Sequence, residues 1–510
     1  MPRYLVTASF ALAAVALAGA SASPALGATR SDCQHRDNGI EVRLLQCIKA
    51  VPLWQHLQDL QKIADENPGA KGHGNRNTGT PGYRASVNYV ANLMEQAGYR
   101  VQIQSYQWRQ SRIIGTSTFS IDGHSFAIAK DWFVASLSGS GKVRAEIAVP
   151  GHHDQDKASG TGCESGAFKD FRRGYVALLR RGSCDFERQV ANAEHAGAAA
   201  VILYNDNPSL VANSYRKNSD GRAFPIQLSQ EAHIPVIGAL SYSSGELLAA
   251  ACRSAKAPIA DISVRTETKS NTDYNVIADS PFGDPEHTIV VDAHLDAIYG
   301  AGILDNGSGS STILEIARNL ANTPTKSRLR YIWFGGEELG LLGSKYYTRN
   351  LGKAELKKIA FDIDVDVTAT PNYAVLIADP GHAHDADEFP PNVVPDSQIG
   401  NHAFLKYFRK IGIPARIASF GNDGTDSLSF SLAGVPNTGI LTQQNCCKHG
   451  WEVRLWGGFS GNFEGKIPSR NGGCVDWPGR WCDNLSNNDR VVLEFVSKAV
   501  AAVVLKFANN

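Results

Sequence analysis

The sequence predicts an α/β protein with a mixed, mostly parallel open sheet flanked by helices, interrupted by a small β-rich domain. Three observations predict this fold. The chain has 510 residues, and because a single hydrophobic core stops growing at about 250 to 300 residues, two or three compact units are expected. Strand-like and helical segments alternate after residue 263, which is typical of an open α/β sheet. Between residues 122 and 262 the sequence instead consists mainly of short β-type runs.

The N-terminal part, residues 23–121, contains two predicted helices and one strand. Residues 57–64 and 85–97 carry apolar side chains at helical spacing. They flank a connector rich in Gly, Asn and Pro, residues 69–83, which indicates a loop. A predicted strand, residues 100–108, follows.

The middle part, residues 122–262, is expected to be an insertion between that first strand and the rest of the sheet. It contains apolar β-type runs at residues 174–179 and 200–204, with a predicted helix over residues 187–197 between them. The final part, residues 263–510, contains four predicted strands, at residues 288–293, 329–334, 361–367 and 373–377.

Charge and the first residues indicate the compartment. The 50 Lys and Arg residues balance the 50 Asp and Glu residues, so no positive surplus is available for a nucleic-acid partner. Arg3 precedes a small apolar run that ends in Ala20-Ser21-Ala22, which predicts a signal peptide over residues 1–22 and a secreted or periplasmic protein. The alternative is a membrane anchor, but the run is short for a span of about 20 residues and lacks a charged stop. No membrane contact is expected after signal removal.

Nine cysteines in an exported chain indicate structural disulfides with one thiol left over. Local spacing suggests three pairs: Cys33 with Cys47, Cys163 with Cys184, and Cys474 with Cys482. Cys446 and Cys447 are adjacent, and the sequence leaves open whether they bridge to each other or to separate partners. Cys252 is expected to be the free thiol.

Candidate metal ligands lie at or just beyond the ends of three predicted strands. These positions are His294, Asp305, the pair Glu337 and Glu338, and Asp366, and open α/β sheets bind ligands at the carboxyl ends of their strands. Each pattern alone is weak, but one imidazole and three carboxylates together form a donor set that suits zinc, while the extra Glu supplies a base. Burying so many carboxylates together also requires a cation to cancel their repulsion.

Three segments resemble the signature of secreted di-zinc aminopeptidases of metallopeptidase family 28. They are His294-Leu295-Asp296, residues 302–309 and residues 336–344. The likeness extends to residues 75–83, 456–458 and 482–487. The inserted block resembles a protease-associated domain in residues 162–163, 181–186 and 196–205.

The resemblance implies a zinc aminopeptidase fold and the following roles. Asp305 bridges two zinc ions, His294 and Asp366 bind one of them, and Glu338 binds the other. Asp362 and Asp364 compete with Asp366, which is preferred because the family's ligand lies five residues before the proline of a Ser/Thr-Pro-Asn turn, here Pro371. Glu337 is the general base that takes a proton from a metal-activated water. Asp296 orients His294.

The sequence departs from the family at the last ligand. The family has a His preceded by a Tyr in the terminal disulfide loop, and residues 474–482 contain neither. Counting from Cys474 places Asp476 at the ligand position, where a carboxylate would make the metal a weaker Lewis acid. His449 is the other candidate, and a third alternative is that this second zinc site stays empty.

The sequence thus predicts a monomeric zinc exopeptidase, an aminopeptidase acting on peptides or proteins. One rival is a non-catalytic peptide-binding protein that lost a metal. A second rival is a one-zinc cyclase acting on N-terminal glutamine. The retained Glu337 and Glu338 favour catalysis over binding alone.

Overall fold

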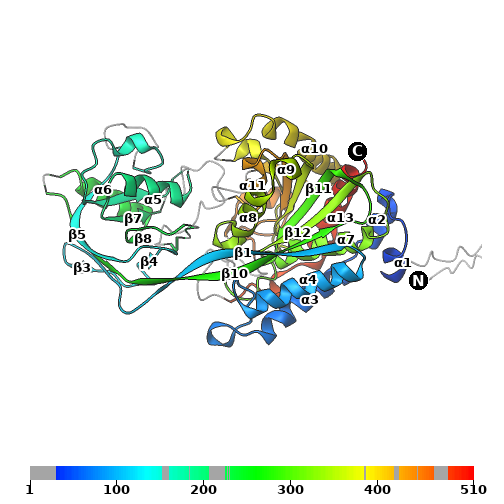
Figure 1. Ribbon diagram of the computed structural model, residues 1–510, viewed down its shortest axis with the longest axis horizontal. Helices are drawn as coiled ribbons and strands as arrows, with labels where there is room; N and C mark the ends of the chain where they lie inside the picture. Colours follow the sequence, from blue (N-terminus) through cyan, green and yellow to red (C-terminus); the bar gives the residue numbers. More distant parts are fainter. Residues whose placement is uncertain are drawn as a thin grey trace, which may run out of the picture.

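The computed structural model describes residues 30–151, 160–182, 184–205, 224–226, 228, 230–254, 256–383, 386–418, 424–444, 446–464 and 481–510. Two eight-stranded sheets organise these residues. Figure 1 shows the two sheets as separate lobes, joined by the long strands β1 (Arg100–Ile113) and β10 (Thr266–Asp279). The predicted signal peptide, residues 1–22, lies outside the described residues.

The larger sheet has the strand order β1-β10-β12-β11-β13-β16-β14-β15. Strands β12, β11, β13 and β16 run parallel to one another, and β14 runs parallel to β15. The pairs β1 with β10, β10 with β12 and β14 with β16 are antiparallel. The bounds are β11 (Asp284–His294), β12 (Ser327–Phe334), β13 (Ile359–Val365), β14 (Leu376–Ala378), β15 (Arg416–Ala418) and β16 (Asn437–Leu441). The predicted mixed, mostly parallel sheet is therefore confirmed.

Helices cover both faces of this sheet, so that its central strands are buried on both sides. One face packs its main core against helices that include α3 (Ala50–Glu66), α4 (Pro81–Gln96), α7 (Gly307–Leu320), α10 (Val393–Ile411) and α13 (Arg490–Ala508). The other face carries a smaller core that includes Phe334, Tyr347 and Phe430, against α8 (Leu342–Asn350) and α11 (Ser427–Leu432). This lobe also contains the short helices α1 (Arg30–Gln34), α2 (Glu41–Cys47), α9 (Lys353–Leu356) and α12 (Gly450–Trp456).

The inserted lobe has its own sheet, in the order β3-β2-β9-β5-β6-β7-β8-β4. Its helices are α5 (Phe186–His195) and α6 (Tyr242–Ala251). The strand bounds are β2 (Thr118–Ile121), β3 (His124–Ser125), β4 (Trp132–Val134), β5 (Gly141–Ala148), β6 (Val176–Arg180), β7 (Ala200–Tyr204), β8 (Val236–Ala239) and β9 (Ile259–Val264). Two apolar clusters form its core, separate from that of the larger lobe.

The first strand is longer than the predicted residues 100–108. β1 stays paired with β10 out to Ile113 opposite Thr266, although the sequence loses its apolar character after Trp108. Backbone pairing extends the strand there, because a two-stranded ribbon needs no buried face to keep its ladder of hydrogen bonds. Ion pairs between the strands, such as Arg112 with Glu267 at 2.6 Å, accompany the pairing.

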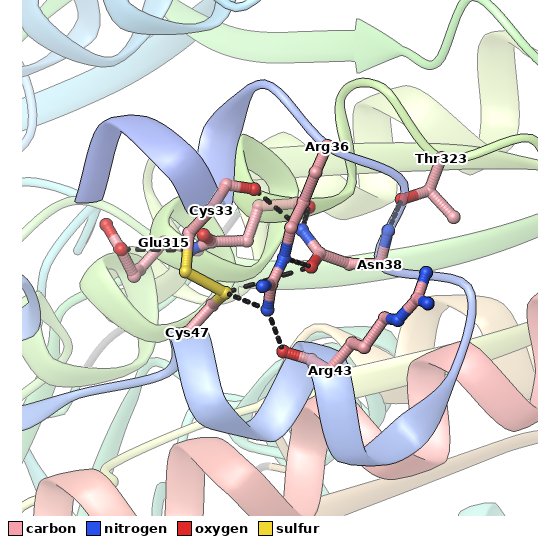
Figure 2. Close-up of a disulfide and its surroundings, with 8 residues drawn as sticks. Cys33, Arg36, Asn38, Arg43, Cys47, Glu315 and Thr323 are labelled. Atoms are coloured by element: carbon pink, nitrogen blue, oxygen red, sulfur yellow. Dashed lines mark hydrogen bonds between the residues drawn. A yellow bond between two sulfur atoms is a disulfide. The ribbon is translucent and has the colours of Figure 1, made fainter. Parts of the chain in front are cut away.

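The N-terminal disulfide forms as predicted, and the segment that it closes, residues 33–47, is hydrogen-bonded to α7 through Asn38 (Figure 2). Cys33 and Cys47 are bonded, and Asn38 lies between them in the chain. The Asn38 side-chain amide donates to the carbonyls of Cys33 and Asn319, each at 2.7 Å, and its backbone N–H donates to Thr323 Oγ1 at 2.9 Å. The segment is therefore tied to the end of the helix that follows Asp305.

The other cysteine predictions have different outcomes. Cys163 pairs with Cys184, and Cys252 is a free thiol, both as predicted. The pairing of Cys474 with Cys482 and the choice of partner for Cys446 and Cys447 involve groups outside the described residues. Within the described part of the chain, no helix is both long and apolar enough to cross a bilayer.

Candidate metal centre

Three adjacent parallel strands bring the predicted ligands to one edge of the sheet. β11 lies between β12 and β13, and its last residue, His294, is in register with Phe334 at the end of β12. Glu337 and Glu338 follow β12 after Gly335 and Gly336, in a short 3-10 helix. Asp366 directly follows β13. The carboxyl ends of these strands meet at the same edge, so the ligands converge from three strands.

His294 lies at the centre of the site. Its side chain is 1% exposed, and its Nε2 lies 3.0 Å from Asp305 Oδ1 and 3.4 Å from Asp366 Oδ1. His294, Asp305 and Glu338 offer ligand atoms that all lie within 4.8 Å of one another. Glu337 Oε2 is farther out, 3.9 Å from His294 Nε2. The structure thus brings together His294, Asp305, Glu337, Glu338 and Asp366.

Asp305 is placed by the start of α7. The Asn306 side chain accepts a hydrogen bond from Gly309 N at 2.8 Å, which caps this helix. The same side chain accepts from Val367 N and donates to Val365 O, both at the end of β13. Gly309 is needed at this contact, because a Cβ there would lie 2.1 Å from Val365 O. The polar turn seen in the sequence therefore fixes Asp305 against the strand that leads to Asp366.

Asp296 touches both His294 and the segment that carries Glu337. The His294 Nδ1 lies 3.2 Å from the Asp296 backbone oxygen and 3.6 Å from its carboxylate Oδ1. That carboxylate accepts hydrogen bonds from Glu337 N at 3.2 Å and from the Thr78 hydroxyl at 2.6 Å. An imidazole whose Nδ1–H donates to oxygen has Nε2 free as a metal ligand, and Nε2 is the atom that faces Asp305.

Charge and burial shift the pKa values in the site. Burial raises the pKa of Glu337 well above its usual value, and Asp366 adds to the increase while His294 opposes it. Burial alone would lower the pKa of His294, but the neighbouring Glu337 and Asp366 raise it well above its usual value. These directions show a strongly negative pocket, in which a positive charge is favoured.

A second group of buried acids lies behind the site on the same face of the sheet. Asp362 and Asp364, which compete with Asp366 as ligands in the sequence, are buried here with Asp292 and Asp426. Burial raises the pKa of Asp364 to about 7, and burial together with the other acids raises the pKa of Asp362 well above its usual value. Of the three acids around β13, Asp366 is the one that forms an ion pair with His294.

Sequence reasoning missed Asp426 and Asp292. Asp426 precedes α11 and interacts with both Glu337 and His294. No spacing or motif links it to the strand ends, because its position depends on how α11 packs on the sheet. Asp292 lies two residues before His294, and period-two alternation along β11 was the signal that placed it on the same face.

The last predicted ligand, Asp476, lies outside the described residues. His449, the other candidate, caps α12 with Glu452, whose carboxylate accepts its backbone N–H at 2.7 Å. Among the described residues, the three-membered ligand group does not include His449.

Comparisons with known proteins identify the family of this chain. Peptidase family M28 matches residues 275–503, and the PA domain matches residues 143–248. An aminopeptidase of Pseudomonas aeruginosa is 31% identical over 469 residues, which cover 90% of this chain and 81% of that protein. The chain belongs to peptidase family M28. This M28 peptidase is therefore a hydrolase with a PA domain, and its relatives support aminopeptidase function.

Solved structures show the same fold for the M28 peptidase. The aminopeptidase from Aneurinibacillus sp. strain AM-1 matches with a TM-score of 0.66 at 22% identity, covering 92% of this chain and 96% of that one. A zinc aminopeptidase from Bacillus subtilis matches with a TM-score of 0.56 at 22% identity, covering 91% and 96%. Both matches span the two lobes.

Proposed function

We propose that this chain is a secreted or periplasmic zinc aminopeptidase that removes N-terminal residues from peptides or proteins. The observation that carries the proposal is the convergence of one imidazole and three carboxylates on adjacent strand ends. The proposed zinc ligands are His294, Asp305, Glu338, Asp366 and Asp476.

The donor set fits zinc. Zinc in proteins takes nitrogen and carboxylate oxygen ligands, and catalytic sites keep a position open for water or substrate. Asp366 Oδ1 is buried and has no hydrogen-bond donor among the described residues, although His294 Nε2 lies 3.4 Å away. Asp305 Oδ1 lies 3.0 Å from His294 Nε2, and Asp305 and Glu338 offer ligand atoms within 4.8 Å of each other, which supports a bridging role between two ions. When bound, zinc would polarise the scissile carbonyl and acidify the attacking water.

Glu337 is the proposed general base. Its pKa is raised by burial, and a carboxylate with a raised pKa is better matched to proton transfer near neutral pH. The Glu337 backbone N–H donates to the Asp296 carboxylate. Asp296, the proposed orienting residue of His294, therefore also holds the backbone of the general base. Glu337 takes a proton from the attacking water as the water oxygen bonds to the carbonyl carbon. Glu337 then gives that proton to the amine nitrogen as the C–N bond breaks.

The domain division and location are part of the proposal. The division is a signal peptide (residues 1–22), two parts of the peptidase domain (23–121 and 263–510) and the PA domain (122–262). The separate sheet of the inserted lobe supports an insertion at this place in the chain, although β2 begins four residues before and β9 ends two residues after the proposed bounds of the PA domain. Disulfides at Cys33–Cys47 and Cys163–Cys184 support an oxidising compartment. We propose that the mature protein is a monomer.

Metal content and substrate choice test the proposal together. Purified protein is stripped with a chelator, reloaded with zinc, and assayed on a panel of aminoacyl p-nitroanilides and their N-acetylated counterparts. An aminopeptidase regains turnover on reloading and cleaves the free-amine substrates alone. Equal cleavage of acetylated substrates would refute exopeptidase action. Failure to bind zinc would refute the proposed site, and one bound zinc with cyclisation of N-terminal glutamine would favour the cyclase.

A further inference from the structure

We propose that Arg76 and Asp483 are positioning residues that hold the ligand loop, residues 295–305, in its metal-binding conformation. This inference rests on the proposed function. The loop connects His294 to Asp305 and contains no regular strand or helix, so hydrogen bonds from elsewhere must fix its shape. The two residues come from opposite ends of the chain.

The N-terminal connector lies along this loop. Residues 76–78 pair with it through backbone and side chains: Arg76 N donates to Gly300 O at 2.8 Å, and Asn77 forms a parallel bridge with Ala297. The Asn77 side chain donates to Ile298 O and accepts from Gly300 N. Thr78 donates to the Asp296 carboxylate. Each of these three connector residues therefore contacts the ligand loop.

Arg76 makes the central contacts. Its guanidinium is fully buried and donates to Leu295 O at 2.5 Å, Ala301 O at 2.6 Å and Gly302 O at 2.8 Å. Its Nε donates to Ser86 Oγ at 3.0 Å. Leu295 directly follows His294, whereas Gly302 lies three residues before Asp305. One planar cation thus joins the two ends of the loop, which the shorter reach and single nitrogen of a lysine cannot reproduce.

Asp483 holds the other side of the loop. Its carboxylate accepts from Leu304 N at 2.7 Å and from Asp305 N at 3.0 Å, so it fixes the backbone of the proposed bridging ligand itself. Burial raises the pKa of Asp483 to about 6, while these amides and Arg76 oppose the increase. Burial lowers the pKa of Arg76 to about 10, and Asp483 is the largest opposing influence. The two buried charges compensate each other across the loop.

The consequence is that loop shape and metal affinity depend on two residues that touch no metal. Residues that orient metal ligands typically affect metal affinity or activity by about 10- to 100-fold when they are changed. Asp483 directly follows Cys482, which is disulfide-bonded. Because the Asp483 carboxylate accepts the backbone N–H of Asp305, it attaches this C-terminal segment to the proposed bridging ligand.

The test measures zinc affinity of the stripped protein, using competition with a chromophoric chelator, together with its apo melting temperature. We expect Arg76→Lys and Asp483→Asn to remain folded and to bind zinc about 10- to 100-fold more weakly than wild type. The matched control is Arg330→Lys. Arg330 is also largely buried and donates to both oxygens of Asp279, at 2.6 and 2.8 Å, but it lies four residues before the end of β12, about 13 Å along the strand.

The control separates positioning from general stability. A positioning role predicts that Arg330→Lys lowers the melting temperature without changing zinc affinity. If Arg76→Lys and Asp483→Asn lower only the melting temperature and bind zinc as wild type does, the inference is wrong. If wild type itself binds no zinc, the proposed function fails instead. Asp483→Asn keeps the side-chain volume, so it provides an independent measurement if Arg76→Lys does not fold.

Discussion

Replacing Glu337 by Gln tests whether the base is distinct from the ligands. The substitution keeps the size and shape of the side chain but removes its negative charge and its ability to accept and carry a proton. Glu337 Oε2 is 3.9 Å from His294 Nε2 and lies outside the three-membered ligand group. We therefore expect Glu337→Gln to retain zinc and to lose turnover.

The size of the effect follows from this geometry. General acid-base catalysis contributes about 10²- to 10⁴-fold to rate, which corresponds to about 2.7 to 5.5 kcal/mol in the activation barrier. The lost charge also weakens the attraction for a proton on His294: with an effective dielectric constant of about 20, a unit charge 3.9 Å from Nε2 contributes about 4 kcal/mol. Three ligand carboxylates remain. His294 also binds a proton less tightly once residue 337 is neutral, so a proton competes less with zinc for Nε2. This weaker competition opposes the loss of one negative charge, and we therefore expect zinc to be retained.

The assay pairs Glu337→Gln with the same change at the adjacent position, Glu338→Gln. Zinc content is measured by atomic emission, and turnover with leucine p-nitroanilide at saturating zinc. We expect Glu337→Gln to keep the wild-type zinc content and Glu338→Gln to lose zinc. The reasoning is refuted if Glu337→Gln loses zinc as Glu338→Gln does, or if its turnover falls by less than tenfold.

Three further predictions concern other parts of the chain. Asp476→Ala should lower zinc content and activity, while Asp476→His should keep zinc and match or exceed wild-type turnover; wild-type behaviour of Asp476→Ala would remove it as a ligand. Replacing residues 122–262 by a short Gly/Ser linker should preserve zinc binding and cleavage of small substrates, and an unfolded, zinc-free product would show that the lobes depend on each other. Burial raises the pKa of Asp273 to about 7, so the stability from its protonated form is present below pH of about 4 and is lost as pH rises through 7. The free energy of unfolding of the zinc-free protein, measured with denaturant, is compared for Asp273→Asn and wild type. The variant should gain about 2 to 3 kcal/mol relative to wild type between pH 5 and pH 8. A difference that does not change with pH would contradict the raised pKa.

The sequence was sufficient to predict that the candidate ligands lie together. His294 ends an apolar strand, Asp366 directly follows another, and Asp305 directly precedes the capped turn at Asn306. Parallel strands bring their carboxyl ends to one edge. These signals are local, so they could be found without knowing the register. The fold class followed from the same alternation of strands and helices. Asp476 remains a prediction.

Other features depend on contacts that no local pattern encodes. Arg76 stands in a connector without periodicity, and only the fold shows that its guanidinium points into the ligand loop. Asp426 reaches the site through the packing of α11. β1 continues beyond Trp108 because β10 pairs with it, and the partner strand is more than 150 residues away in sequence.

The paired strands β1 and β10 also bear on how such a chain folds. Arg112 and Glu267 are 155 residues apart, so closing that loop from an unfolded chain carries a substantial entropic cost. If the inserted lobe folds first, its own sheet brings the two strands together and the loop behaves as a connection of about ten residues. That reduces the closure cost by about 2 kcal/mol. The insertion is then an early folding unit that speeds the pairing of β1 with β10, and pulse-labelling hydrogen exchange should show its amides protected before those of β10.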